Sequence, residues 1–255
     1  MVVTERLANS LEDALVSLRG GGFVLLHDAT SRENEIDMVL AAEFASPEHV
    51  RTMRTEAGGL VCVALSNEIA RKLGLVMMHD IFHSAAHQYP ILRSLNEDEA
   101  PYGGRAAFSI TVNHRSTYTG ITDLDRSLTI CELARLAKKV IENGHDTTGE
   151  FVRDFRAPGH VHLLLESEGS LKERRGHTEL SVRLCQLAGI TPVAALCEML
   201  DGDTHKALSI DSARAFSRRH AIPIIEADQV MSNLFRNDVA SYRRKSVSPW
   251  SPESN

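Results

Sequence analysis

The stretch FVLLHDATSRENEIDMVLAAEF, residues 23–44, decides the fold that this sequence predicts. Apolar runs open and close it, at residues 23–27 and 38–44, and each has the length of a buried strand. Between them, residues 32–37 (RENEID) carry three carboxylates spaced two residues apart. Crowded carboxylates raise each other's pKa, and either a hard divalent cation or bulk water offsets that cost. The sequence therefore predicts two strands joined by either a metal-binding loop or a solvated acidic turn.

A second polar segment, RRGHTE, opens a helical pattern far downstream. Apolar residues recur every three or four positions behind it, which predicts a helix over 177–188. Free N–H groups at a helix start bind anions, and Arg174, Gly176 and Thr178 would add a guanidinium, an open backbone and a hydroxyl for a phosphate. His177 is a candidate metal ligand. The alternative is structural, with Thr178 as an ordinary N-cap and His177 on the surface.

Strand and helix patterns alternate along the rest of the chain. We expect helices at 4–19, from 47, at 66–73, 125–140, 177–188 and 211–220, and strands at 23–27, 38–44, 60–65, 108–113, 160–165, 193–200 and 222–225. This mixture predicts an α/β (α+β) fold, as a single domain over residues 1–238 with a mixed sheet flanked by helices. Residues 239–255 are expected to be a disordered tail. Residues 79–106 are the least regular stretch, either an active-site cover or surface decoration.

The composition bounds the class of protein. Of the 255 residues, 43% are hydrophobic and 24% charged, as in ordinary globular proteins. The formal charge of −6 argues against a nucleic-acid partner, and no apolar run approaches the ~20 residues that span a bilayer. The first residues, MVVTER, lack the apolar core of a signal peptide, and the four cysteines (62, 131, 185 and 197) lack a CxxC spacing. We therefore expect a cytoplasmic protein with buried thiols, without a membrane partner.

Five motifs and a late carboxylate occur in a fixed order along the chain. They are RENE with a trailing Asp37 (32–37), GGLVC (58–62), TGIT (119–122), PGH (158–160), RRGHT (174–178) and Cys197-Glu198. This order resembles the 3,4-dihydroxy-2-butanone-4-phosphate synthase family of riboflavin biosynthesis, over roughly residues 10–235. Residues 79–106 resemble its archaeal branch. The resemblance implies a carbon–carbon lyase that converts D-ribulose 5-phosphate into 3,4-dihydroxy-2-butanone 4-phosphate and formate. It also implies a homodimer, with one or two Mg²⁺ or Mn²⁺ ions per site and no organic cofactor.

The resemblance also implies roles for individual residues. Glu33 and His177 would bind the metal, and Glu35, His160 and Glu198 would be catalytic. The implied substrate-binding residues are Arg32, Glu33, Asp37, Thr119, Arg174, Arg175, Gly176, His177 and Thr178. A histidine titrates near neutrality, so His160 suits proton transfer, and Glu198 at the end of an apolar strand could have a raised pKa. The alternatives are a loop histidine and a surface carboxylate.

Some expectations stay open at this point. Ile36 stands where many members carry glycine, which could stiffen the acidic loop. Cys62 could approach the site, although a buried small hydrophobe is the simpler role. His160 lies far from the acidic loop in sequence, so we expect it to serve the metal site of a neighbouring subunit across a two-fold axis. Two other functions remain possible: another metal-dependent sugar-phosphate enzyme, such as an aldolase or isomerase, and a non-catalytic binding module for phosphorylated ligands.

Overall fold

The acidic segment joins two neighbouring strands of one sheet in the computed structural model. The model describes residues 10–96, 100–143 and 147–232. Strand β1 (Val24–His27) pairs antiparallel with β2 (Ile36–Ala41), and Leu26 lies opposite Asp37. The second strand therefore starts before residue 38 and takes in the end of the acidic segment. It also ends earlier than predicted, because a 3-10 helix, η1 (Ala42–Phe44), follows it.

Seven strands of the described residues form one mixed sheet, with the order β4-β5-β3-β6-β2-β1-β7. The remaining strands are β3 (Cys62–Leu65), β4 (Phe108–His114), β5 (Phe155–Leu165), β6 (Val193–Glu198) and β7 (Ile224–Glu226). Two pairs, β1 with β7 and β3 with β5, are parallel, and the other pairs are antiparallel. The predicted α/β fold with a mixed sheet is confirmed.

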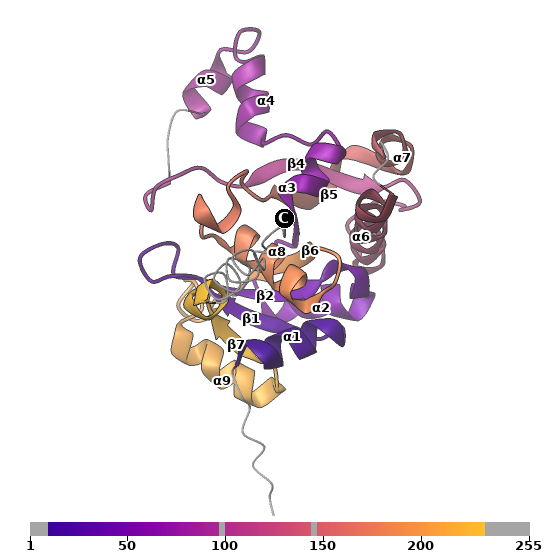
Figure 1. Ribbon diagram of the computed structural model, residues 1–255. Coiled ribbons are helices and arrows are strands. Elements are labelled where there is room, and N and C mark those ends of the chain that lie inside the picture. The colour runs from indigo at the N-terminus through magenta and orange to yellow at the C-terminus, as the bar shows by residue number, and fades with distance from the viewer. Residues whose placement is uncertain (1–9, 97–99, 144–146, 233–255) are drawn as a thin grey trace, which may run out of the picture.

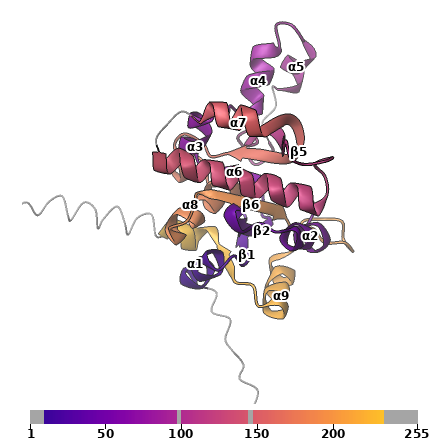
Figure 2. The same ribbon diagram turned by 90° about the vertical axis from the view of Figure 1, so that its right-hand side faces the viewer.

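Helices cover both faces of this sheet and bury two apolar cores (Figures 1 and 2). One face packs against α1 (Leu11–Arg19) and α8 (His177–Ala188). The other packs against α2 (Pro47–Glu56), α3 (Asn67–Lys72), α6 (Asp123–Asn143) and α9 (Ile210–His220). Leu18 in the first core and Leu133 in the second are fully buried, and each such burial contributes about 2 kcal/mol. Figure 2 shows α6 in front of the sheet, beside α7 (Thr148–Asp154).

Two predicted boundaries differ from the structure for local reasons. The Oγ of Ser10 accepts the N–H of Asp13, so Ser10 is the N-cap of α1, which begins at residue 11. The predicted residues 4–9 lie outside the described residues, as does the predicted tail at 239–255. The irregular stretch predicted at 79–106 contains two short helices, α4 (Met78–Ala85) and α5 (Ile91–Leu95). They bury no residue and project from the sheet (Figure 1).

The Pro158-Gly159-His160 motif is part of a strand and not a turn. Strand β5 begins at Phe155, five residues before the predicted start, and pairs with β4 through irregular register. A Cβ on Gly159 would lie 1.9 Å from the backbone carbon of Val112, so only glycine fits this close approach of two strands. No helix of the described residues is long and apolar enough to span a membrane.

Candidate functional site

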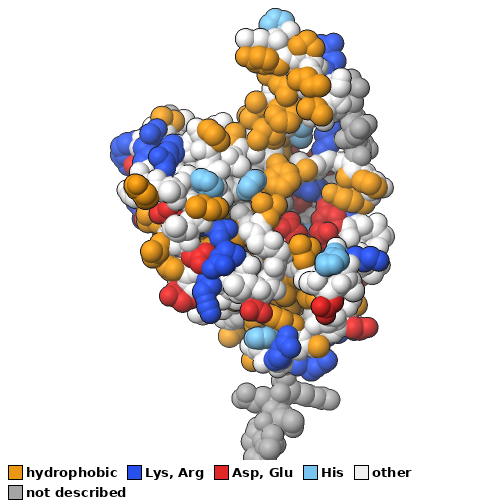
Figure 3. Space-filling model, turned by 180° about the vertical axis from the view of Figure 1, so that it is seen from behind, with side chains coloured by type: hydrophobic (Ala, Val, Ile, Leu, Met, Phe, Trp, Pro, Cys, Tyr) orange, Lys and Arg blue, Asp and Glu red, His pale blue; other side chains and the backbone are white. Residues whose placement is uncertain are grey.

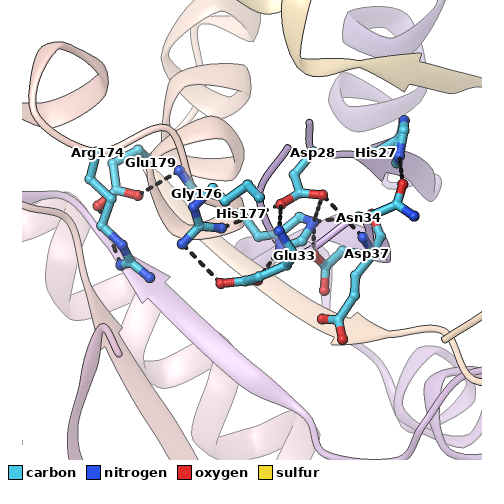
Figure 4. Close-up of polar contacts among 11 residues, drawn as sticks. His27, Asp28, Glu33, Asn34, Asp37, Arg174, Gly176, His177 and Glu179 are labelled. Carbon is cyan, nitrogen blue, oxygen red and sulfur yellow. Dashed lines mark hydrogen bonds and ion pairs between the residues drawn. The ribbon is translucent and has the colours of Figure 1, made fainter. Parts of the chain in front are cut away.

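The carboxylate of Asp28 holds the backbone of the acidic loop in place. Its side chain is fully buried at the end of β1, and its two oxygens accept the N–H groups of Glu33 at 3.1 Å and Glu35 at 3.0 Å (Figure 4). The guanidinium of Arg32 lies 3.4 Å away. Asp28 is not among the predicted site residues. The available signal was its position directly after a buried strand, where a carboxylate can hold the loop that folds back over it.

His177, the first residue of α8, reaches the same loop. It is 6% exposed, and its Nδ1 lies 3.1 Å from Oε2 of Glu33. Its Nε2 lies 2.9 Å from Oδ2 of Asp37 and 3.9 Å from Oδ1 of Asp28 (Figure 4). One ligand atom each from Asp28, Glu33 and His177 lies within 4.8 Å of the others, as a cation site requires. The structure therefore brings together the two predicted metal ligands and adds Asp28.

The close packing of these groups sets their charge. Burial lowers the pKa of His177, but the carboxylates of Asp37, Glu33 and Asp28 outweigh it and raise that pKa well above its usual range. Burial likewise opposes ionisation of Glu33, yet His177 and Arg32 lower the pKa of Glu33 to about 2. Oδ1 of Asp37 is buried and has no hydrogen-bond partner among the described residues. Asp28, Glu33 and Asp37 thus form a negatively charged cluster around the imidazole of His177.

Two further carboxylates with raised pKa values lie next to this cluster. Glu198 ends β6 directly opposite Asp37 on β2. Burial and the charge of Asp37 raise the pKa of Glu198 to about 7. Burial and the neighbouring Glu33 also raise the pKa of Glu35. Both can therefore carry a proton closer to neutral pH than an ordinary carboxylate.

The loop before α8 is held by a buried acid that sequence analysis also missed. Glu179 is 0% exposed and accepts the N–H groups of Ser167 at 3.1 Å and Gly176 at 3.3 Å. Its carboxylate lies 3.6 Å from the Arg174 guanidinium. An acid at the third helical position is the sequence signal for such a cap. Gly176 is the N-cap and Thr178 lies inside the helix, so the alternative of Thr178 as an N-cap is wrong.

Two adjoining cavities open above these residues. The first, of about 200 Å³, is lined by Glu33, Glu35, Arg174, His177, Thr178 and Glu198. The second, of about 410 Å³, is lined by Arg32, His79, Tyr102, Arg105, Arg174 and Arg175. Tyr102 borders both cavities. Figure 3 shows acidic side chains in a hollow below the projecting α4–α5 segment.

Tyr102 links the 79–106 segment to the acidic loop. Its hydroxyl donates to the Glu33 carboxylate, and the Arg32 guanidinium lies 5.1 Å from the centre of its ring. Tyr102 is not among the predicted site residues, because no periodic pattern places an irregular segment against a distant loop. These contacts favour the active-site cover over surface decoration.

Thr119 and His160 are not brought to this cluster within one chain. His160 lies on β5 and Thr119 follows β4, so both are at one side of the sheet. There Thr119 contacts Asp125 and His160 contacts Asn113. Strands β3 and β6 separate β5 from β2. At about 4.8 Å per strand, His160 lies roughly 14 Å from the row of Asp37.

The four cysteines, all within the described residues, are free thiols. Cys62 is fully buried, and burial raises the pKa of its thiol far above the usual range. A buried neutral thiol behaves as a small hydrophobe, as the simpler expectation had it.

The chain is similar to known proteins of one family. The family model described as 3,4-dihydroxy-2-butanone 4-phosphate synthase matches residues 12–233. A protein of that name from Methanothermobacter thermautotrophicus is 45% identical over 223 residues, which cover 88% of this chain and 95% of the relative. One from Archaeoglobus fulgidus is 40% identical, over 87% and 92% of the two chains. A crystal structure of 3,4-dihydroxy-2-butanone 4-phosphate synthase in complex with two magnesium ions is 29% identical. It has a TM-score of 0.71 and covers 90% of this chain and 98% of the other.

Proposed function

The chain belongs to the 3,4-dihydroxy-2-butanone 4-phosphate synthase family, and from that premise we propose that it converts D-ribulose 5-phosphate into 3,4-dihydroxy-2-butanone 4-phosphate and formate in riboflavin biosynthesis. The observation that carries the proposal is a pair of adjoining cavities, one with carboxylates and His177, the other with four arginines. A sugar phosphate needs both kinds of cavity: carboxylates and an imidazole for its reacting carbons, and arginines for its phosphate. The two products together have the elemental composition of the substrate, so the reaction is redox-neutral and needs no external oxidant or reductant, and we propose no organic cofactor for it.

We assign the divalent cation to Glu33 and His177, with Asp28 as a third candidate ligand. Two carboxylates and one imidazole, together with the unpartnered Oδ1 of Asp37, fit a hard cation that keeps some water ligands. When bound, Mg²⁺ or Mn²⁺ would polarise the carbonyl and hydroxyl oxygens of the substrate. The residues leave the choice between these two ions open.

Proton transfer falls to the carboxylates with raised pKa values. Enolisation requires removal of the proton on C3, beside the C2 carbonyl, and later steps return protons to oxygen. Glu35 and Glu198 line the smaller cavity, both with raised pKa values, and Glu198, with a pKa of about 7, can exchange a proton near neutral pH. Burial and the charge of Asp37, which lies opposite, raise the pKa of Glu198 to about 7, so it can both hold and release a proton at neutral pH.

The phosphate group is assigned to the larger cavity. Arg174 and Arg175 come from the loop before α8, Arg32 comes from the acidic loop, and Arg105 comes from the segment after α5. Guanidinium groups bind phosphate oxygens in bidentate fashion. Arg174 and Tyr102 line both cavities, so the two cavities adjoin. A substrate whose phosphate lies in the larger cavity would place its reacting carbons in the smaller one, beside Glu33 and Glu198.

We further propose a cytoplasmic homodimer whose sites use residues of both subunits. His160 and Thr119 lie too far from Glu33 to join the site of their own chain. Exposed apolar side chains lie within five residues of Thr119 in the chain, with Tyr118 94% exposed, Leu124 69% and Ile121 52%. A patch of this kind beside site residues fits an isologous interface. The four free thiols fit a reducing compartment.

The proposal is tested by incubating the purified protein with D-ribulose 5-phosphate and Mg²⁺ and assaying formate. We expect formate release, and Glu33→Gln should lower it by at least about a hundredfold, since glutamine keeps the volume but loses the charge that holds a cation. Glu142→Gln, an exposed change on α6, is the matched control and should have no effect. An aldolase or isomerase would release other products without formate, and a binding module would retain the substrate without turnover.

A further inference from the structure

The ring of His160 is held from one side by a single amide. His160 lies on β5, and its Nδ1 is 3.1 Å from Nδ2 of Asn113 on the neighbouring strand β4. The imidazole itself is exposed, whereas Asn113 is buried, at 3% exposed. The buried partner therefore fixes the exposed ring, and not the reverse.

Two backbone groups fix which way the Asn113 amide faces. Its Oδ1 accepts the backbone N–H of His160 at 2.8 Å, and its Nδ2 donates to the carbonyl of Thr119 at 3.3 Å. A flipped amide would set an NH₂ group against an N–H and an oxygen against a carbonyl, so both contacts would become repulsive. The NH₂ group must therefore be the end that faces Nδ1 of His160.

The surrounding backbone locks the amide in this place. Gly120 has a φ of +99°, and a Cβ there would lie 2.0 Å from Nδ2 of Asn113. The N–H of Gly120 donates to Asp125 at 2.8 Å, which holds the loop against the amide. The amide thus fills a space that its neighbours leave for it, and it has little freedom to rotate.

A donor at Nδ1 determines the tautomer of a neutral histidine. Because the Asn113 NH₂ group offers only hydrogens, Nδ1 must accept with its lone pair, and the ring proton must lie on Nε2. We propose that Asn113 is a positioning residue that fixes His160 as the Nε2–H tautomer, so that His160 meets the substrate as a hydrogen-bond donor. The catalytic part of this statement rests on the proposed function.

The Nε2–H tautomer limits the chemical roles that His160 can take. With a proton on Nε2 and Nδ1 occupied, His160 has no free lone pair for a metal ion or for a carbon-bound proton. It serves the neighbouring site by donating a hydrogen bond to a substrate oxygen on which negative charge develops. The cation remains with Glu33 and His177.

The direct test is a two-bond ¹H–¹⁵N spectrum of the protein labelled with ¹⁵N-histidine, recorded at about pH 8, where a histidine with an ordinary pKa is neutral. The His160 signals are identified by their loss in His160→Gln. We expect Nδ1 to resonate as an unprotonated nitrogen and Nε2 as a protonated one. The reverse pattern in the wild-type protein would overturn the proposal. This measurement requires no activity, so its result is separate from that of the formate assay, and His160→Gln is needed only in folded form, to assign the signals.

Asn113→Asp provides the second arm. A carboxylate in place of the NH₂ group accepts at Nδ1, so the His160 proton should move to Nδ1 and the two ¹⁵N shifts should exchange. His162, two residues along β5 with its Nδ1 unpartnered among the described residues, is the internal control and should keep its shifts. The kcat for formate release should fall at least about tenfold with little change in KM, as expected for loss of a hydrogen-bond donor that acts in the transition state. An unchanged His160 tautomer in folded Asn113→Asp protein would contradict the positioning role.

Discussion

Individual carboxylates of the site are separated by their surroundings into ionised and protonated groups. Glu33 lies against His177 and Arg32, which keep its pKa at about 2 despite burial. Glu198 is buried beside Asp37, and its pKa rises to about 7 although His177 acts in the opposite direction. Such a division between neighbouring acids is what assigns one to charge stabilisation and the other to proton transfer.

The raised pKa of Glu198 has a consequence for stability. Its folded pKa, about 7, lies above the ordinary value of 4.5, so the folded state favours the protonated form. The stabilisation is complete below about pH 4.5, declines as the pH rises to 7, and is lost above it. At 1.36 kcal/mol per pKa unit, the total is at most about 3 kcal/mol.

We therefore expect Glu198→Gln, which is neutral at every pH, to gain stability relative to the wild type as the pH rises. In urea unfolding of metal-free protein, the difference in unfolding free energy should shift by about 2 to 3 kcal/mol in favour of the variant between pH 5 and pH 8. Glu142→Gln on the surface of α6 is the control. A difference that does not change with pH would show that Glu198 ionises normally.

Among the elements, the sequence predicted those that carry a strong local pattern. Helix α2 begins at the predicted residue 47, and α8 covers the predicted 177–188. Helices α4 and α5 were missed because they are short, bury no residue and lack a side-chain cap, so no periodicity marks them. The first half of β5 was missed for a related reason. It is largely exposed, and only its pairing with β4 makes it a strand.

The 79–106 segment acts on the site through Tyr102, and this gives an element-scale prediction. Tyr102→Ala removes a hydrogen bond to Glu33 and the aromatic contact of Arg32, so kcat/KM should fall about tenfold or more. Tyr102→Phe keeps the aromatic contact and should have a smaller effect. Tyr89→Ala, on an exposed residue of the same segment, is the matched control. Equal kinetics for the two alanine variants would identify the segment as surface decoration.

At the scale of the whole molecule, the fold class followed from the alternation of elements, but the strand order did not. The sheet places β6 between β2 and β3, so strands far apart in sequence become neighbours. This long-range pairing sets Glu198 opposite Asp37, and local patterns carry no information about such a register. The sequence motifs therefore named residues that the fold brings together, such as Glu33, His177 and Glu198. The contacts of Asp28, Glu179 and Tyr102 required the folded structure.

The same sheet order separates His160 from Glu33 by two intervening strands, and this separation allows the proposed shared site to be tested. Glu33→Gln and His160→Ala chains, each inactive alone, are mixed, unfolded and refolded together. If each site combines the acidic loop of one subunit with His160 of the other, every heterodimer regains one intact site. Random pairing makes half of the dimers heterodimers, so formate release should recover to roughly a quarter of the wild-type value. If both residues belong to one chain, every site in the mixture remains defective. An inactive mixture whose dimers have exchanged, as mass spectrometry of differently labelled chains would detect, therefore excludes a shared site.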